Sequence, residues 1–570
     1  MTTGSPTTEQ SSTRPTSPRA PRVLGNLTYL VGVVDLLTGL FHGWRVRTQW
    51  LAELLPGALS DAAAAATIVS GVFLIVLGHS LKRRKVRAWR AAVALLAMST
   101  ALHIVKTEPA SAVLSLLGLA LLVRYRSSFR ALGDPKTRWR SVGAFAGLLA
   151  FSLVAGSFVI FMARDDIVGG WPSTTDLLTE LVYGFVGVTG PLQFTSDRAG
   201  DVVFSVLLGL GLMTLLTPVY LALRPPEPRP AMSDDDEQRL RELISRHPDS
   251  LGYFNLRRDK DVVWSPSGKA AIAYRVVSGV MLASGDPMGD PEAWPGAMKA
   301  FLERAEEHAW TPVVLACSER AGRAWVRDTD FSAFELGDEA VVDTTTFTLE
   351  GRPMRNVRQM VRRVERAGYV VEVTRASEVD EGVRRRVLVD AEAWRSSDTE
   401  RGFSMALGRL LEREDGDCVF VAARQDGVVR AFLQFVPWGS DGISLDVMRR
   451  DRDADPGVNE LMIAAVLQAA QGLGVKQVSL NFAAFRSGLE ERERLGAGPI
   501  ARLWGWVLHV ASRWLQIESL YRFNAKFQPQ WRSRFLIYPT GRDLPRAALA
   551  ALEAEAFLTW PKLGRLGASR

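Results

Sequence analysis

Hydrophobic residues form long runs in the first 223 residues, whereas short apolar runs alternate with polar segments in the rest of the chain. Ser141–Ala163 and Val202–Leu223 contain no charged residue, and each is long enough to cross ~30 Å of hydrocarbon as a helix. Four further segments are shorter or interrupted: Leu24–Phe41, Ala62–Leu81, Ala91–Val105 and Pro109–Val123. The pattern predicts a multi-pass α-helical membrane domain of about six helices over residues 23–224, or four if the last two segments form a re-entrant pair.

The short loops between these segments differ in charge. Six basic residues and no acidic one follow Leu81, and six more follow Val123 against the single Asp134, whereas the segment around Asp165 and Asp176 is acidic. Basic short loops stay in the cytoplasm. Because both span counts are even, we expect the N- and C-termini to be cytoplasmic.

Two ionisable residues, Asp35 and His103, interrupt the apolar segments. An ionisable group inside a membrane span is a functional candidate. Both residues lie near segment ends, which favours a position at the membrane interface.

The pattern changes after Leu223. A Pro-rich linker over residues 225–240 is followed by alternating strands and helices. The predicted strands are Val262–Trp264, Ala271–Val276, Val280–Ala283, Val313–Ala316 and Tyr369–Val373, and the helices include Glu237–Ser245, Ala297–His308 and Arg355–Ala367. This alternation predicts a layered α/β domain of two similar halves, 241–400 and 401–570, with a cleft between them. Residues 1–22 are polar and are expected to be a disordered tail.

Composition narrows the class of protein. A hydrophobic share of 47% is high for a soluble enzyme, and a net charge of +7 suits an anionic partner such as a lipid surface or a nucleic acid. The two cysteines, Cys317 and Cys418, have no neighbouring Cys or His at ligand spacing. We therefore expect two buried structural thiols and no metal site.

The helix after Met354 has two distinct stripes. Val357, Val361 and Val364 continue an apolar stripe that begins at Met354. A basic stripe runs beside it through Arg355, Arg358, Arg362 and Arg366. The basic stripe is either a solvated face, partly balanced by Glu365, or a phosphate-binding ridge for a polyanion.

Motifs over the last 320 residues resemble the C-terminal domain of phosphatidylglycerol lysyltransferases, the aminoacyl-phosphatidylglycerol synthases. Their order and spacing, rather than any one of them, make the resemblance specific. The motifs are Phe254–Lys260, Ser284–Pro287, Arg355–Arg358, Gly402–Met405, Ser444–Arg449, Asn459–Met462 and Leu520–Phe527, the last continuing to Pro529, Trp531, Arg534 and Phe535.

The resemblance implies two acetyltransferase-like (GNAT) folds in the cytoplasm and an enzyme of the bacterial plasma membrane. Such enzymes move an amino acid, here expected to be lysine, from aminoacyl-tRNA to phosphatidylglycerol, and the product is linked to antimicrobial peptide resistance. Arg355, Arg358 and Arg362 of the basic stripe are then expected to bind the tRNA. Large family members have more membrane helices and a lipid-flipping module, so this chain is not assigned flipping. The compact Asn524–Lys526 stretch also departs from larger members and leaves the choice of amino acid open.

Three residues are the catalytic candidates: Asp446 and Arg449, three apart at the end of an apparent strand, and Lys526. Ester exchange needs a proton relay for the lipid hydroxyl and cations for the oxyanion and the phosphates. An ordinary surface ion pair is the alternative for Asp446 and Arg449. The residues expected to bind substrate are Asn459, Glu460, Asn481, Glu518 and Arg534, of which Glu460 or Glu518 is suited to the amine.

Two further segments concern a possible cofactor and a possible contact with the membrane. Ala469–Gly474 lacks the leading Arg or Gln of a coenzyme A loop, so no cofactor is expected. Pro499–Phe523 is rich in Trp and suits either a core helix or a helix docked at the bilayer interface. The alternative function is a lipid transporter with a regulatory cytoplasmic domain, and a homo-oligomer is left open.

Overall fold

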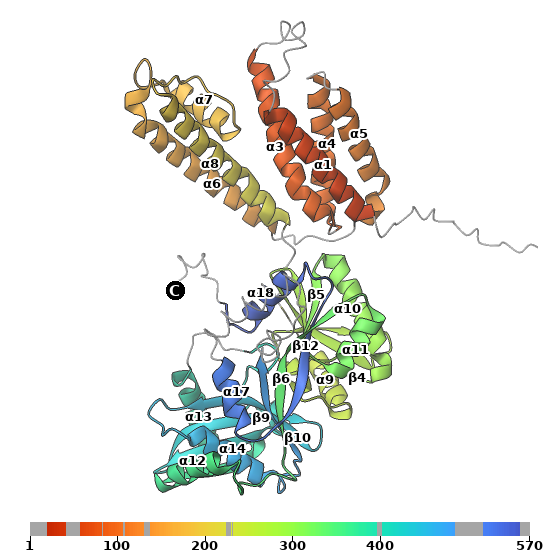
Figure 1. Ribbon diagram of the computed structural model, residues 1–570, viewed down its shortest axis with the longest axis vertical. Coiled ribbons are helices and arrows are strands. Elements are labelled where there is room, and N and C mark those ends of the chain that lie inside the picture. The colour runs from red at the N-terminus through yellow and green to blue at the C-terminus, as the bar shows by residue number, and fades with distance from the viewer. Residues whose placement is uncertain are drawn as a thin grey trace, which may run out of the picture. The chain divides into compact units, whose positions relative to one another are not determined.

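The computed structural model describes residues 20–40, 57–82, 84–105, 109–129, 137–223, 232–395, 402–484 and 517–558, together with positions 228 and 230. The chain divides into two compact units at residues 226 and 227, and each is described by itself (Figure 1). Most of Pro499–Phe523, the Trp-rich segment, lies outside the described residues.

The first unit is helical, and its described helices, apart from the short α7, form where the apolar segments predict them. They are α1 (Ala20–Leu40), α3 (Gly57–Lys82), α4 (Val86–Val105), α5 (Pro109–Arg124), α6 (Thr137–Met162), α7 (Thr174–Phe185) and α8 (Asp197–Leu223). Glycines allow α1 and α3 to pack closely, since a Cβ on Gly32 would lie 2.7 Å from the carbonyl oxygen of Gly71.

Two of the described helices are long and apolar enough to cross a membrane, at Val142–Met162 in α6 and Asp197–Val219 in α8. Six of the seven described helices coincide with the six predicted segments, but only these two have the length and composition of a membrane span, and the prediction of about six spans is not confirmed. The apolar stretches Val69–Lys82 in α3 and Pro109–Arg124 in α5 are shorter.

Asp35 and His103, which the sequence predicts to lie at the membrane interface, are both buried within the helical unit. The His103 Nε2 lies 2.9 Å from the Asp35 Oδ1, and the Ser99 hydroxyl donates to the Asp35 Oδ2 at 2.8 Å. A buried ionisable group is costly unless it is paired, so these residues hold α1 and α4 together.

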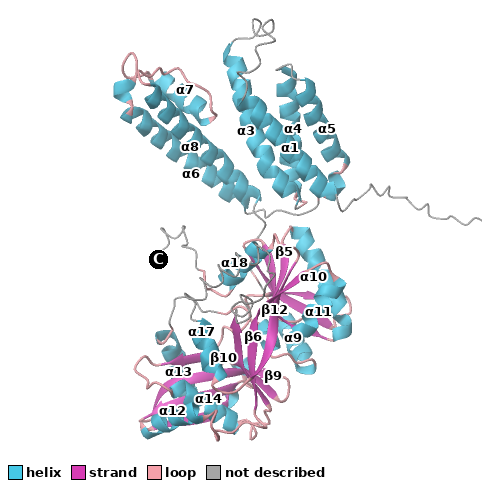
Figure 2. Cartoon of the chain, in the orientation of Figure 1, coloured by secondary structure: helices cyan, strands magenta, loops and turns pink. Residues whose placement is uncertain are grey.

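The second unit contains one sheet of 12 strands, magenta in Figure 2. In chain order the strands are β1 (Asp261–Trp264), β2 (Ala270–Val277), β3 (Val280–Ser284), β4 (Met288–Gly289), β5 (Thr311–Ser318), β6 (Ser332–Asp343), β7 (Tyr369–Arg375), β8 (Val419–Gln425), β9 (Val428–Trp438), β10 (Gly442–Arg450), β11 (Gln477–Ala484) and β12 (Gln530–Tyr538). The helices are α9 (Asp234–Arg246), α10 (Trp294–His308), α11 (Glu319–Asp328), α12 (Arg355–Arg366), α13 (Glu381–Ala393), α14 (Val458–Ala469), α17 (Ile517–Ala525) and α18 (Leu544–Ala554). The strands and helices predicted from the pattern are confirmed.

The sheet repeats one strand arrangement and exchanges the last strand of each repeat. β2, β3 and β5 repeat the pairing of β9, β10 and β11: an antiparallel hairpin followed by a parallel neighbour. β6 follows β5 in the chain but pairs with β11. β12 follows β11 in the chain but pairs with β5. β6 and β12 also pair with each other, so the two repeats are joined into one sheet.

The exchange means that no single residue separates the two halves. β7 precedes residue 400 in the chain but pairs with β8. Alternating side chains of β8 face two different cores, with Val419 and Val421 packed near α12 and α14, and Phe420 packed in a cluster that also contains residues of β2 and β3. That shared cluster fixes both repeats to each other. Cys317 and Cys418 are buried free thiols, as predicted.

Candidate functional site

The parallel strands β10 and β11 pair over only three residues and then separate. The last paired positions are Ser444 and Ser479. Two residues further on, Asp446 lies at a β-bulge, because the pairing with β9 shifts between Leu445 and Val447. A bulge redirects the side chain of the extra residue, so the local backbone, rather than strand alternation, decides where Asp446 points.

The Asp446 carboxylate holds a loop formed by residues 402–411, hereafter the 402–411 loop. Its Oδ1 accepts from the backbone N–H of Leu407 at 2.8 Å, and its Oδ2 accepts from the Gln434 Nε2 at 2.8 Å. Gln434 in turn donates to the Arg409 carbonyl and accepts from the Leu411 N–H. Asp446 and Gln434 therefore fix one side of this loop to β9 and β10.

Asn481 bridges the two separating strands. Its Nδ2 donates to the Leu445 carbonyl at 3.0 Å and to the Met405 carbonyl at 3.1 Å. Its backbone is left-handed, with φ of 69°, a conformation that Asn tolerates better than most residues. Asn481 thus connects β11, β10 and the 402–411 loop at the point where the strands part.

Glu555 and Arg257 hold the other end of the 402–411 loop. Glu555 is buried and accepts from the N–H groups of Phe403 and Ser404 and from the Ser404 hydroxyl. Arg257 donates to the Gly402 carbonyl. Neither role could be read from the sequence: Arg257 lies in a quoted motif without an assigned contact, and Glu555 lies in no motif.

Lys526 and Glu460 form an ion pair in a pocket of about 620 Å³. The Lys526 Nζ lies 2.7 Å from the Glu460 Oε1 and 5.1 Å from the centroid of the Phe523 ring. The same pocket is lined by Arg362, Arg363 and Arg366 of α12, which packs beside α14 (Figure 1). Residues from three separate motifs therefore meet in one cavity.

The three arginines predicted to bind tRNA occupy different environments. Arg362 lines the pocket. Arg358 donates to the carbonyls of Leu349 and Gly351 and so holds the turn before α12. Arg355 is exposed at the first turn of the helix, outside the pocket lining.

Three other predicted residues are not among the described residues that line this pocket. Arg449 is half-buried on β10, opposite Phe432 of β9. Asn459 precedes Glu460 on α14, and its buried Oδ1 has no hydrogen-bond partner among the described residues. Glu518 is in α17, and its side chain lies outside the described part of the chain.

Arg534 is buried in a polar network between the exchanged strands. Its guanidinium pairs with Glu339 of β6 at 2.6 Å and with Asp249 at 3.2 Å. Burial acts to raise the pKa of Glu339, but Arg534 and hydrogen bonds from Ser479 and Ser250 outweigh it and hold that pKa below its usual range. The network connects β12, β6 and β11 just before the point where β10 and β11 separate.

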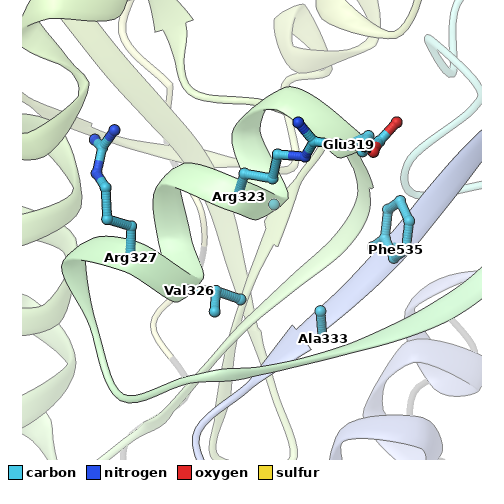
Figure 3. A pocket seen from close by; sticks show the side chains of 7 residues that line it. Glu319, Arg323, Val326, Arg327, Ala333 and Phe535 are labelled. Atoms are coloured by element: carbon cyan, nitrogen blue, oxygen red, sulfur yellow. Dashed lines mark hydrogen bonds and ion pairs between the residues drawn. The ribbon is translucent and has the colours of Figure 1, made fainter.

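A further hollow of about 400 Å³ lies between α11 and the strands β6 and β12 (Figure 3). Val326, Ala333 and Phe535 give it an apolar floor, and Arg323 and Arg327 lie along its edge. Both arginines already have acidic partners, Glu319 and Asp328. We assign no chemistry to this hollow. No group of three potential metal ligands occurs among the residues that the structure describes.

Residues 241–538 match the family model for the C-terminal domain of phosphatidylglycerol lysyltransferase. Two similar curated proteins are lysylphosphatidylglycerol biosynthesis bifunctional proteins named LysX. The one from Rhodococcus opacus is 42% identical over 466 residues, covering 80% of this chain and 41% of the relative. The one from Nocardia farcinica is 37% identical over 558 residues, covering 96% and 49%. The chain therefore spans about half the length of the curated relatives it matches.

The solved structure of L-PGS from Bacillus licheniformis has the same fold as the second unit. The match has a TM-score of 0.51 and 22% identity, and it covers 59% of this chain and 99% of that one. At this identity the likeness concerns the fold alone.

Proposed function

Because this chain belongs to the phosphatidylglycerol lysyltransferase family, we propose that it transfers an aminoacyl group, lysyl in the first instance, from aminoacyl-tRNA to a glycerol hydroxyl of phosphatidylglycerol. The product is a cationic aminoacyl-phospholipid. The relatives' printed names concern lysylphosphatidylglycerol biosynthesis, which supports both the lipid and the amino acid.

The observation that carries this proposal is the pocket that joins Lys526 and Glu460 to the arginines of α12. Guanidinium groups bind phosphates through paired, charge-assisted hydrogen bonds, and the acceptor end of a tRNA brings several phosphates. A carboxylate in the same pocket is suited to the ammonium of the aminoacyl group. The pocket thus offers complementary charges for both ends of an aminoacyl-tRNA terminus.

The transfer exchanges one ester for another. The lipid hydroxyl oxygen forms a bond to the aminoacyl carbonyl carbon, the bond from that carbon to the ribose oxygen breaks, and the hydroxyl proton ends on the ribose oxygen. We assign Arg449 and Lys526 to stabilising the developing negative charge and the neighbouring phosphates. Asp446 acts as a positioning residue, since its two oxygens already hold Leu407 and Gln434.

We place the first unit in the bacterial plasma membrane and, from the basic short loops of the sequence, both termini in the cytoplasm. α6 exposes large apolar side chains, including Phe151 at 57%, Val154 at 72% and Phe158 at 59%. Exposed apolar surface of this extent suits lipid rather than water.

The test is transfer of labelled lysine from lysyl-tRNA to phosphatidylglycerol vesicles by the purified full chain. We expect Lys526→Ala to lower the rate by ~10²–10³, since one cation of the transition-state site is lost. Lys476→Ala is the matched control, because Lys476 is exposed and its ion-pair partner among the described residues is the half-exposed Asp441. A surface pair of that kind contributes ~0–1 kcal/mol, so the control should transfer normally.

Binding of lysyl-tRNA is measured alongside to separate binding from chemistry. A rate for Lys526→Ala that equals the rate of the control would refute the site. Failure of the unmodified chain to transfer any amino acid to any hydroxylated phospholipid would refute the function.

A further inference from the structure

The strand repeat places a second carboxylate in the position of Asp446. The parallel pairing of β3 and β5 ends at Ser284 and Leu315, as that of β10 and β11 ends at Ser444 and Ser479. Asp286 lies two residues beyond Ser284, and Asp446 lies two residues beyond Ser444. Asp286 is therefore the topological counterpart of Asp446 in the first repeat.

The two carboxylates have different partners. Asp446 accepts from Leu407 of the 402–411 loop on one oxygen and from Gln434 of β9 on the other, whereas Asp286 accepts from the N–H of Ser318 at 2.7 Å and from its hydroxyl at 2.5 Å. No described cation lies within ion-pair distance of Asp286. Burial and the neighbouring Asp249 raise the pKa of Asp286 to about 6, although Arg534 acts in the opposite direction.

Asp286 opens on a pocket of about 310 Å³. Asp249 lines the same pocket, and Ile244, Met288 and the buried Trp294 give it an apolar wall. Arg246 and Arg320 line its exposed side, and no described carboxylate lies within ion-pair distance of either. The Arg320 guanidinium lies 5.4 Å from the centroid of the Trp294 ring. The pocket therefore combines acidic groups inside, basic groups outside and an apolar wall.

We infer that this pocket is a second ligand site, which binds a free α-amino acid. The ammonium group of the ligand lies against Asp286, its carboxylate pairs with Arg320 or Arg246, and its side chain contacts Trp294. A desolvated carboxylate without a cation is costly, and a bound ammonium removes that cost. The pocket is close in size to the smallest ligand pockets, which suits a single amino acid.

The site has a physical connection to the proposed transfer centre. Arg534 contacts Asp249 of the pocket, and it also pairs with Glu339, which accepts a hydrogen bond from Ser479 of β11. Ser479 in turn accepts from the N–H of Asn481. A ligand that contacts Asp286 and Asp249 would thus be connected by a chain of hydrogen bonds to the strand that carries Asn481. The inference concerns the binding of a free amino acid and does not depend on the proposed transfer activity.

The experiment is isothermal titration of the full chain in detergent with each of the standard L-amino acids, without tRNA or phosphatidylglycerol. At least one should bind the unmodified chain. Asp286→Asn and Arg320→Gln should each weaken that binding by roughly tenfold to hundredfold, since each removes a charge-assisted contact. Arg320 is exposed, so Arg320→Gln should fold normally. Its binding can therefore still test the inference if Asp286→Asn does not fold.

Controls distinguish this pocket from the transfer site. Arg323→Gln changes the next basic residue of α11, which pairs with Glu319, and should bind normally. Asp446→Asn should also bind normally. The amide of the bound amino acid keeps the ammonium but lacks the carboxylate, so it should bind as weakly as the acid binds to Arg320→Gln.

Three outcomes would overturn the inference. They are an absence of binding by every amino acid, binding that is lost in Asp446→Asn but kept in Asp286→Asn, and equal binding of the acid and its amide. The last outcome would point to an aminoacyl-lipid head group, whose amino acid also lacks a free carboxylate.

Discussion

One extra residue in β10 decides which atoms the Asp446 carboxylate can reach. The bulge at Asp446 points it toward two donors, the Leu407 N–H and the Gln434 Nε2. An Asn side chain at this position has one acceptor, its carbonyl oxygen, and one donor, its NH2 group. At one of the two contacts this NH2 group would therefore face another N–H donor, and the hydrogen bond would be lost. We predict that Asp446→Asn lowers stability by ~1–3 kcal/mol.

Displacement of the 402–411 loop should also reduce transfer in Asp446→Asn, by up to ~10²-fold. Thermal unfolding and the transfer assay measure the two effects. Asp441→Asn, a change at a half-exposed residue before β10, is the control. Unchanged stability together with reduced transfer would instead favour a direct catalytic role for Asp446.

Lys260 is a fully buried lysine beside the same loop. Its Nζ donates to the Phe254 carbonyl at 2.9 Å and lies 4.6 Å from the centroid of the Phe403 ring. Burial lowers the pKa of Lys260 from 10.5 to about 7, although Asp259 acts in the opposite direction. Between these two pKa values the unfolded chain binds a proton that the folded chain does not.

Stability should therefore rise as the pH increases from about 7 toward 10.5, and this contribution should be absent in Lys260→Met. The measurement is the difference in unfolding temperature between the two proteins across that pH range, which cancels the titration of other groups. A difference that is constant with pH would show that Lys260 keeps its charge when buried.

At the scale of elements, α12 uses its basic residues for two purposes. Arg358 holds the preceding turn through backbone carbonyls, whereas Arg362 and Arg366 line the pocket with Lys526. We predict that replacing Arg362 and Arg366 with Ala weakens binding of lysyl-tRNA and reduces its salt slope by up to ~1 per lost phosphate contact.

Arg358→Ala should lower stability and leave the salt slope of tRNA binding near that of the unmodified chain. Filter binding at several salt concentrations measures both slopes. If the double variant keeps the full slope, the basic stripe of α12 is a solvated face.

At the scale of the whole second unit, the strand exchange makes each repeat depend on the other. β6 lies between β11 and β12, which come from the second repeat, and β12 lies between β5 and β6. Fragments 227–350 and 351–570 would each expose strand edges that the complete sheet pairs. We predict that each fragment alone is insoluble or unfolded.

Co-expression of the two fragments should restore a soluble complex, and the uninterrupted 227–570 chain is the control. Circular dichroism and cooperative thermal unfolding report folding. A fragment 227–350 that unfolds cooperatively by itself would contradict the dependence of one repeat on the other.

The sequence alone determined the features that depend on local pattern. Apolar run lengths located six described helices of the first unit but not α7, and the switch to strand and helix periodicity located the start of the α/β unit. The ordered motifs identified the family and marked Glu460 and Lys526, and the basic stripe marked Arg362; the fold brings all three into one pocket. Periodicity and motifs are readable because they involve neighbours in the chain.

Only the tertiary structure decided which distant groups meet. The pairing of Asp35 with His103, the hold of Glu555 and Gln434 on the 402–411 loop and the contact of Arg534 with Glu339 join residues far apart in the sequence. Hydrogen-bond partners of buried polar groups are fixed by which strands lie side by side. In this sheet the exchange of β6 and β12 decides that order, and no local pattern records it.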